Sequence, residues 1–255
     1  MWGGVGAPLA RSGSSVPAYV RDAEVAQASR ALLVRIEPGA VTWFVDEPGR
    51  PRWGDGETGV VLGGSSAAVA AARTVVAQLA SGRQVEGLAG DLARLGISHV
   101  RVGGTTPDVL AALNATPGLQ RGTDDPAGAV WIVTGKPSRL QVVAGSEVSY
   151  VAGAVPPGPS GRLLILADGP AERRTVTVGG APLAPAASPD WRAAYELGAA
   201  AGPVVIGSTG SSWWSWLQLA GLALLAVFAA PSLQRETDTV QPVARRASAT
   251  AEEAR

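Results

Sequence analysis

The stretch "VEGLAGDLARLGISHVRVGG", residues 85–104, contains a helix pattern followed directly by a strand pattern. Leu88, Leu92 and Leu95 recur at i, i+4 and i+7, the spacing that places side chains on one face of an α-helix. Gly96 follows the last leucine, at the position where glycine commonly ends a helix. The stretch therefore predicts a short amphipathic helix that leads into the strand "SHVRV".

The same alternation of strand and helix patterns extends on both sides of this stretch. "GVVLGGSSAAVAAARTVVAQLASG" (59–82) predicts a short strand, a glycine turn and a helix capped by Ser65 or Ser66. Pro107 is typical of a first helical position and predicts another helix. The other β-rich runs are "ALLVRIE" (31–37), "AVTWFV" (40–45) and "AVWIVTG" (129–135). We therefore expect an α/β layer over residues 29–135.

After residue 137 the pattern changes to short strand-like runs separated by glycine and proline. These runs are "SRLQVVAG", "EVSYVAGAV", "GRLLILAD", "RTVTVGGAPL", "WRAAYELG" and "GPVVIGS". No helix pattern intervenes, and "VGGA" (178–181) is typical of a hairpin turn. This spacing predicts a small antiparallel β-sandwich over residues 138–208.

The stretch "SSWWSWLQLAGLALLAVFAAPSLQR" (211–235) predicts one C-terminal transmembrane helix. The segment from Trp213 to Ala230 carries no charge, and its length of roughly 27 Å as a helix approaches that of a hydrocarbon core. Trp213, Trp214 and Trp216 crowd its first turn, where aromatic rings favour the headgroup level. The expected partner of this segment is the lipid bilayer.

Basic residues predict the orientation of this span. Arg235, Arg245, Arg246 and Arg255 follow it, and the nearest basic residue before it is Arg192. Positive charge stays inside, so we expect a cell-membrane protein with a cytoplasmic C-terminus and the bulk of the chain extracytoplasmic. The expected segments are a lead-in over residues 1–28, an α/β domain over 29–137, a β-sandwich domain over 138–210, the membrane helix over 211–231 and a disordered cytoplasmic tail over 232–255.

Composition excludes several classes of function. The net charge is zero, which gives no electrostatic basis for binding nucleic acid. The chain has no cysteine and a single histidine, His99, so we expect no metal site, and no motif indicates a cofactor.

Three segments suggest chemistry, but each has a simpler interpretation. "VLGGSSAAVA" lacks the third glycine of a dinucleotide-binding turn and is better explained as a capped β–α turn. Asp124 and Asp125 precede proline and glycine, which indicates a solvated turn. His99 has no acid or nucleophile placed with it and is interpreted as structural. We therefore assign no catalytic residue.

Tryptophan supplies the candidate for ligand binding, because its face can stack on a sugar ring. Trp43 and Trp131 lie inside apolar strands and are expected in the core. Trp53 is flanked by Arg52 and Asp55 in a long loop, so it is the tryptophan we expect to be exposed and to bind a ligand.

Several phrases of this chain resemble the C-terminal extracytoplasmic region and last membrane helix of large polytopic family-2-type membrane glycosyltransferases of high-GC Gram-positive bacteria. They are "RALLVRIEPGAVTWFVDEPG", "LARLGISHVRV", "LNATPGLQR", "AVWIV", "GRLLILAD", "TVTVGGAPLAP" with "WRAAYELG", and the tryptophan-rich helix with "PSLQR". The resemblance implies that the catalytic domain lies upstream. The partners that the resemblance implies for this chain are upstream membrane glycosyltransferase subunits or envelope glycans. No residue of this chain matches a catalytic motif of that family, so no catalytic residue is assigned from the resemblance.

Two main functions follow from these observations. The first is a non-catalytic, membrane-anchored extracytoplasmic module of a cell-envelope glycosyltransferase-like protein, of which the chain is a C-terminal fragment. The alternative is an independent single-pass membrane protein whose cytoplasmic α/β domain binds a nucleotide or a partner. A stand-alone enzyme would have to use Asp55, Glu57 and Asp124, which no motif places together.

Overall fold

The computed structural model describes residues 16–47, 62, 65–125, 128–169, 174–208 and 212–229. In this part of the chain there are five helices and fourteen strands, and the strands form three sheets. Met1–Gly210 forms one compact unit and Ser211–Arg255 a second. The predicted fold class must be corrected accordingly, because three sheets dominate the structure and no membrane helix is present in its described part.

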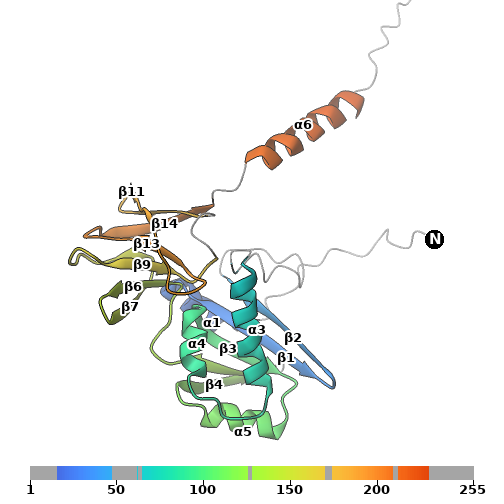
Figure 1. Cartoon of the computed structure of the whole chain (residues 1–255). Helices are drawn as coiled ribbons and strands as arrows, with labels where there is room; N and C mark the ends of the chain where they lie inside the picture. The colour runs from blue at the N-terminus through green and yellow to red at the C-terminus, as the bar shows by residue number, and fades with distance from the viewer. Residues whose placement is uncertain are drawn as a thin grey trace, which may run out of the picture. The chain divides into compact units, whose positions relative to one another are not determined.

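The first sheet has five strands in the order β2-β1-β3-β5-β4 (Figure 1). Its strands are β1 (Arg30–Glu37), β2 (Ala40–Asp46), β3 (Ile97–Gly103), β4 (Leu119–Asp125) and β5 (Gly128–Val133). Only β1 and β3 pair in parallel, and the other neighbours pair antiparallel. The chain between β1 and β3 passes through helices, which is the crossover that a parallel pair requires.

Helices cover both faces of this sheet. Helices α3 (Ser66–Ala80), α4 (Leu88–Arg94) and α5 (Pro107–Ala115) cover one face, and α1 (Ala18–Gln27) covers the other. Successive side chains of a strand point to opposite faces. Leu32 and Val34 of β1 therefore belong to the large core under α3 to α5, whereas Ala31 and Leu33 belong to the small core under α1.

Residues 85–104 fold as their pattern predicts. Leu88 and Leu92 lie on α4, Leu95 follows it as the C-cap, and all three are buried. Gly96 then adopts φ 70°, a left-handed conformation that glycine reaches without strain. A Cβ on Gly96 would lie 3.0 Å from Arg139, so the glycine also allows a close approach between the end of α4 and the segment before β6.

The remaining strands form two antiparallel sheets that enclose a second core. One has the order β12-β13-β9-β6-β7 and the other β11-β10-β14-β8. Val178 pairs with Ala181 across two glycines with positive φ, which confirms the predicted hairpin turn. The strands are β6 (Leu140–Ala144), β7 (Glu147–Val151), β8 (Ala154–Val155), β9 (Leu163–Leu166), β10 (Arg174–Val178), β11 (Ala181–Pro182), β12 (Pro185–Ala186), β13 (Ala193–Glu196) and β14 (Gly202–Ser208).

A buried cluster of charges joins the first sheet to the second core. We call it the Arg30 cluster, and it consists of Arg30, Glu47, Arg139, Asp168 and Arg174. Arg30 is 0% exposed and donates hydrogen bonds to Glu47, to Asp168 and, at 2.6 Å, to the carbonyl oxygen of Ala167. Arg139 bonds to both carboxylates from the other side.

The C-terminal segment contradicts the predicted membrane helix over residues 211–231. It forms α6 (Ser212–Ala229), and no helix in the described residues is long and apolar enough to cross a membrane. The predicted single membrane span and membrane location are therefore wrong. The interfacial role expected of Trp213, Trp214 and Trp216 depended on that span and loses its basis with it.

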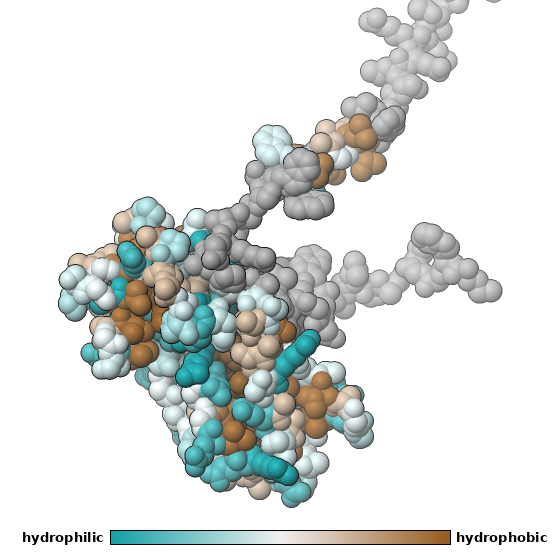
Figure 2. Space-filling view, viewed as in Figure 1, coloured by the Kyte–Doolittle hydropathy of each residue, from teal (hydrophilic) through white to brown (hydrophobic). Residues whose placement is uncertain are grey.

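On the described part of α6, leucine side chains are exposed (Figure 2). The four most exposed leucines are Leu219, Leu222, Leu224 and Leu225. The predicted tail over residues 232–255 and most of the lead-in over 1–28 lie outside the described residues, apart from the segment that contains α1.

Replacing Arg30 by methionine should lower the free energy of unfolding of the chain by about 3–5 kcal/mol, because the variant removes the fully buried guanidinium group that Glu47 and Asp168 share and leaves their negative charges only partly compensated. The matched control is Arg35→Met, since Arg35 pairs with Glu37 but its side chain is 72% exposed. That variant should change stability by about 1 kcal/mol or less. Chemical denaturation measures both, and equal small effects would show that the Arg30 cluster does not hold the unit together.

Candidate functional site

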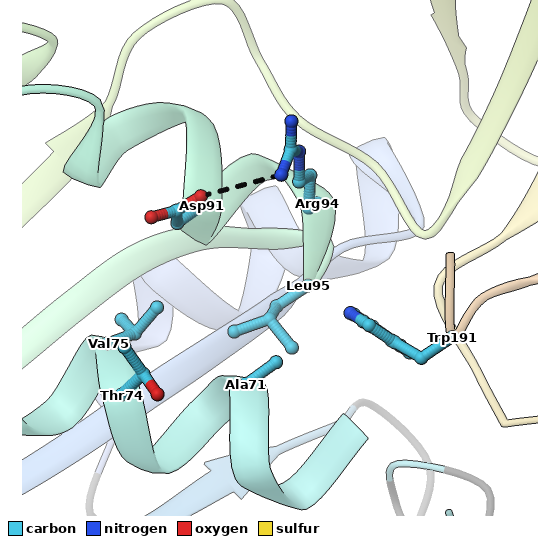
Figure 3. A pocket seen from close by; sticks show the side chains of 7 residues that line it. All are labelled: Ala71, Thr74, Val75, Asp91, Arg94, Leu95 and Trp191. Carbon is cyan, nitrogen blue, oxygen red and sulfur yellow. Dashed lines mark ion pairs between the residues drawn. The ribbon is translucent and has the colours of Figure 1, made fainter. Parts of the chain in front are cut away.

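Trp191 lies in the loop between β12 and β13 and closes one end of a pocket of about 180 Å³. Figure 3 shows Ala71 and Thr74 of α3 on one side of this pocket and Leu95, after α4, near its centre. The ring nitrogen of Trp191 points toward Leu95 in this view. The pocket therefore lies where the two helices meet the second half of the compact unit.

Trp191 also lines a second pocket of about 420 Å³. The remaining lining residues come from the start of α3 and from the segment around Trp191: Ser65, Ala67, Ala186, Ala187, Ser188, Asp190, Arg192, Ala193 and Ala194. The volume of this pocket is within the range of small-ligand sites, and the alanines contribute only small apolar side chains to its lining. We call the two pockets together the Trp191 groove.

A chain of hydrogen bonds fixes the position of Trp191 relative to α4. Gln141 of β6 donates to the carbonyl oxygen of Ala93 in α4 at 3.3 Å. The same glutamine accepts a hydrogen bond from Arg192 at 2.7 Å. Asp190 in turn accepts bonds from the backbone N–H and the side chain of Arg192 at 2.9 Å. Both neighbours of Trp191 are thus held, and the indole is presented from a fixed backbone.

The charged residues of the groove are paired with one another. Asp190 forms an ion pair with Arg192 at 2.8 Å, and Asp91 pairs with Arg94 at 3.8 Å (Figure 3). Burial alone would raise the pKa of Asp190, but its hydrogen bonds with Arg192 hold that pKa below the usual range. Asp190 is therefore a carboxylate at neutral pH, and its negative charge compensates the positive charge of Arg192.

The indole N–H of Trp191 has no hydrogen-bond acceptor within the part of the chain that the structure describes. Trp131 is different, because its indole N–H donates to Asn114 at 3.1 Å and its ring is buried in the main core. Trp191 is only partly buried and packs against the edge of the same core. It therefore offers an aromatic surface together with an available donor.

The structure does not test the predicted ligand residue, because Trp53 lies outside the described residues. Trp131 is fully buried and Trp43 packs against the main core, which confirms the structural role expected of both. Sequence reasoning missed Trp191 as the tryptophan of a pocket. The signal that selected Trp53 was present here too, since Trp191 stands between Asp190 and Arg192 in a loop.

The other residues singled out by sequence do not come together at this groove. His99 is buried, its ring hydrogen-bonds with Ser98 at 2.8 Å, and burial lowers its pKa. Asp124 is held by Arg121 at 2.8 Å on β4. Ser65 caps α3 by accepting a hydrogen bond from the N–H of Ala68, which confirms the predicted cap. Asp55 and Glu57 lie outside the described residues.

One further titratable group is unusual, although it lies on α1, away from the groove. Glu24 is 1% exposed, and neither of its carboxyl oxygens makes a hydrogen bond within the described residues. Burial, followed by the repulsion of Asp46, raises its pKa to about 8. The group is therefore protonated at neutral pH, a form that sequence reasoning had no means to detect. No group of three or more histidine, aspartate or glutamate side chains in the described residues could hold a metal ion.

Comparisons of the chain with known protein families, with curated proteins and with solved structures find no match.

Raising the pH from about 4.5 to 8 should lower the free energy of unfolding through Glu24. The folded state keeps this proton up to about pH 8, whereas the unfolded state releases it near 4.5, the ordinary pKa of a glutamate side chain, so the folded state binds more protons between the two. One such group contributes a slope of up to about 1.4 kcal/mol per pH unit.

Denaturation at a series of pH values should show that Glu24→Gln removes most of this slope. Glu37→Gln is the matched control, because Glu37 is exposed at the end of β1. A Glu24→Gln variant that keeps the wild-type slope would contradict the assignment.

Proposed function

We propose that this chain is a non-catalytic carbohydrate-recognition module that serves a glycosyltransferase-like protein, with the Trp191 groove as its ligand site. The observation that carries the proposal is the partly exposed indole of Trp191, whose N–H is without an acceptor in the described structure and which lines two adjoining pockets. An aromatic face beside polar groups suits a sugar ring, which presents C–H groups on its faces and hydroxyl groups at its edge.

The lining of the groove supports a recognition role. Trp191 supplies an apolar surface, and the hydroxyl of Ser188 and the carboxylate of Asp190 lie in the same pocket. These groups can accept hydrogen bonds from sugar hydroxyls, and the indole N–H can donate one. The alanines of the lining leave room for a ring to approach the indole.

The resemblance of the chain to C-terminal regions of glycosyltransferases supports the partner class. In such an arrangement the reaction takes place on an upstream catalytic domain, and this module holds the carbohydrate near it. The charged residues of the groove support a binding role, because Asp190 and Asp91 are each engaged by an arginine instead of being poised as an acid and a base.

Neutral oligosaccharides of glucose, mannose, galactose or N-acetylglucosamine should perturb Trp191 selectively. The full chain labelled with 5-fluorotryptophan allows this to be measured by fluorine NMR, with the Trp191 signal assigned from Trp191→Phe. At least one oligosaccharide should shift that signal and leave the signal of the buried Trp131 unchanged. Trp191→Ala should weaken binding at least tenfold, which corresponds to about 1.4 kcal/mol.

Trp216→Ala is the matched control, because Trp216 is 69% exposed on α6 and does not line the groove. It should bind as the wild-type chain does. If no oligosaccharide in the panel moves the Trp191 signal, or if Trp191→Ala binds with unchanged affinity, the proposed function is wrong.

A further inference from the structure

The Trp191 groove is lined by two carboxylates and two guanidinium groups, so the charges of its lining sum to zero. Each carboxylate is paired with a guanidinium group, Asp190 with Arg192 and Asp91 with Arg94. Neither pocket is lined by Lys136, the single lysine of the chain. In the larger pocket, a ligand with two phosphate groups would meet Arg192, whose guanidinium group is already paired with Asp190.

Arg192 is the cation best placed in the larger pocket, and its hydrogen-bonding groups are already engaged. Its backbone N–H and its Nε donate to Asp190, and its Nη1 donates to Gln141. The arginine is also buried, so it cannot turn toward a ligand without breaking these bonds. Since the pKa of Asp190 lies below its usual range, the pair persists at neutral pH.

The first turn of α3 is the other feature that could attract an anion. A helix N-terminus carries roughly half a positive charge. Here the hydroxyl of Ser65 is occupied in capping, and the carboxylate of Asp190 lines the same pocket as Ser65 and Ala67. A full negative charge in the same pocket offsets that partial charge, so this helix end does not create a phosphate site.

We infer that the Trp191 groove takes the uncharged sugar chain on which a glycosyltransferase acts and excludes the nucleotide-linked sugar donor. This inference rests on the function proposed above and names the substrate class of the same site. The discrimination is electrostatic: a neutral glycan uses the indole and the hydroxyl-accepting groups, whereas a diphosphate meets Asp190 and a guanidinium group that is already neutralised.

The test titrates the fluorotryptophan-labelled full chain with two probes, the neutral oligosaccharide that shifts Trp191 most and uridine diphosphate glucose. We expect the neutral probe to bind at least tenfold more tightly through Trp191. Equal or tighter binding of uridine diphosphate glucose at Trp191 would overturn the inference and leave a recognition role intact. If neither probe moves the Trp191 signal, the proposed function fails as well, so the two failures are distinguishable.

A variant that frees Arg192 from its ion pair tests the electrostatic basis of this discrimination. Asp190→Asn removes the negative charge that neutralises Arg192, and uridine diphosphate glucose should then bind at least fivefold more tightly than to the wild-type chain, with a stronger dependence on salt. Asp124→Asn is the matched control, because it also breaks a carboxylate–guanidinium pair, with Arg121 on β4, but Asp124 and Arg121 line neither pocket. It should leave the affinity for uridine diphosphate glucose within twofold.

The thermal midpoint of each variant shows whether it is folded. If Asp190→Asn is folded and still does not bind the nucleotide sugar more tightly, charge pairing is not the basis of exclusion and the inference is wrong. If Asp190→Asn does not fold, Asp190→Ser replaces it under the same criterion, because serine also removes the charge and keeps an acceptor for the backbone N–H of Arg192.

Discussion

The buried guanidinium of Arg30 is the interaction on which the rest of the compact unit depends. A charge without access to water costs several kcal/mol unless its partners surround it in good geometry. Its partners come from segments far apart in the chain: Glu47 after β2, Ala167 and Asp168 after β9, and the carbonyl oxygen of Leu95 after α4. All of these segments must be in place before Arg30 can be buried, so the cluster links the first sheet to the second core.

The position of the Trp191 groove follows from this link. Arg139 belongs to the Arg30 cluster and directly precedes β6, where Gln141 bonds to α4 and to Arg192. The loop that carries Trp191 is therefore fixed against α3 and α4 through the same strand that completes the cluster. A groove with such fixed walls is pre-organised, so little side-chain freedom is lost when a ligand binds.

Local patterns accounted for the elements whose structure depends on neighbouring residues. The leucine stripe and Gly96 defined α4, Ser65 defined the start of α3, and the glycine pair after Val178 defined a hairpin. The apolar segment near the C-terminus misled the same reasoning, because low charge and high apolar content indicate a helix without showing where that helix lies. The described part of α6 is helical as expected, yet it does not meet the requirements of a membrane span.

The periodic elements could be predicted from the sequence, since a helix or a turn depends on side chains within a few positions of one another. The sequence did not indicate that Arg30 at the start of β1 would meet Asp168, or that Trp191 rather than a core tryptophan would line pockets. Nor did it indicate that Glu24 of α1 would be buried with no hydrogen bond to its carboxyl group in the described part of the chain. Those facts depend on contacts between residues about 100 or more positions apart or on burial by other elements. They could be recognised only in the folded chain, because burial and pairing set the energy of a charge or an indole, and residue type alone does not.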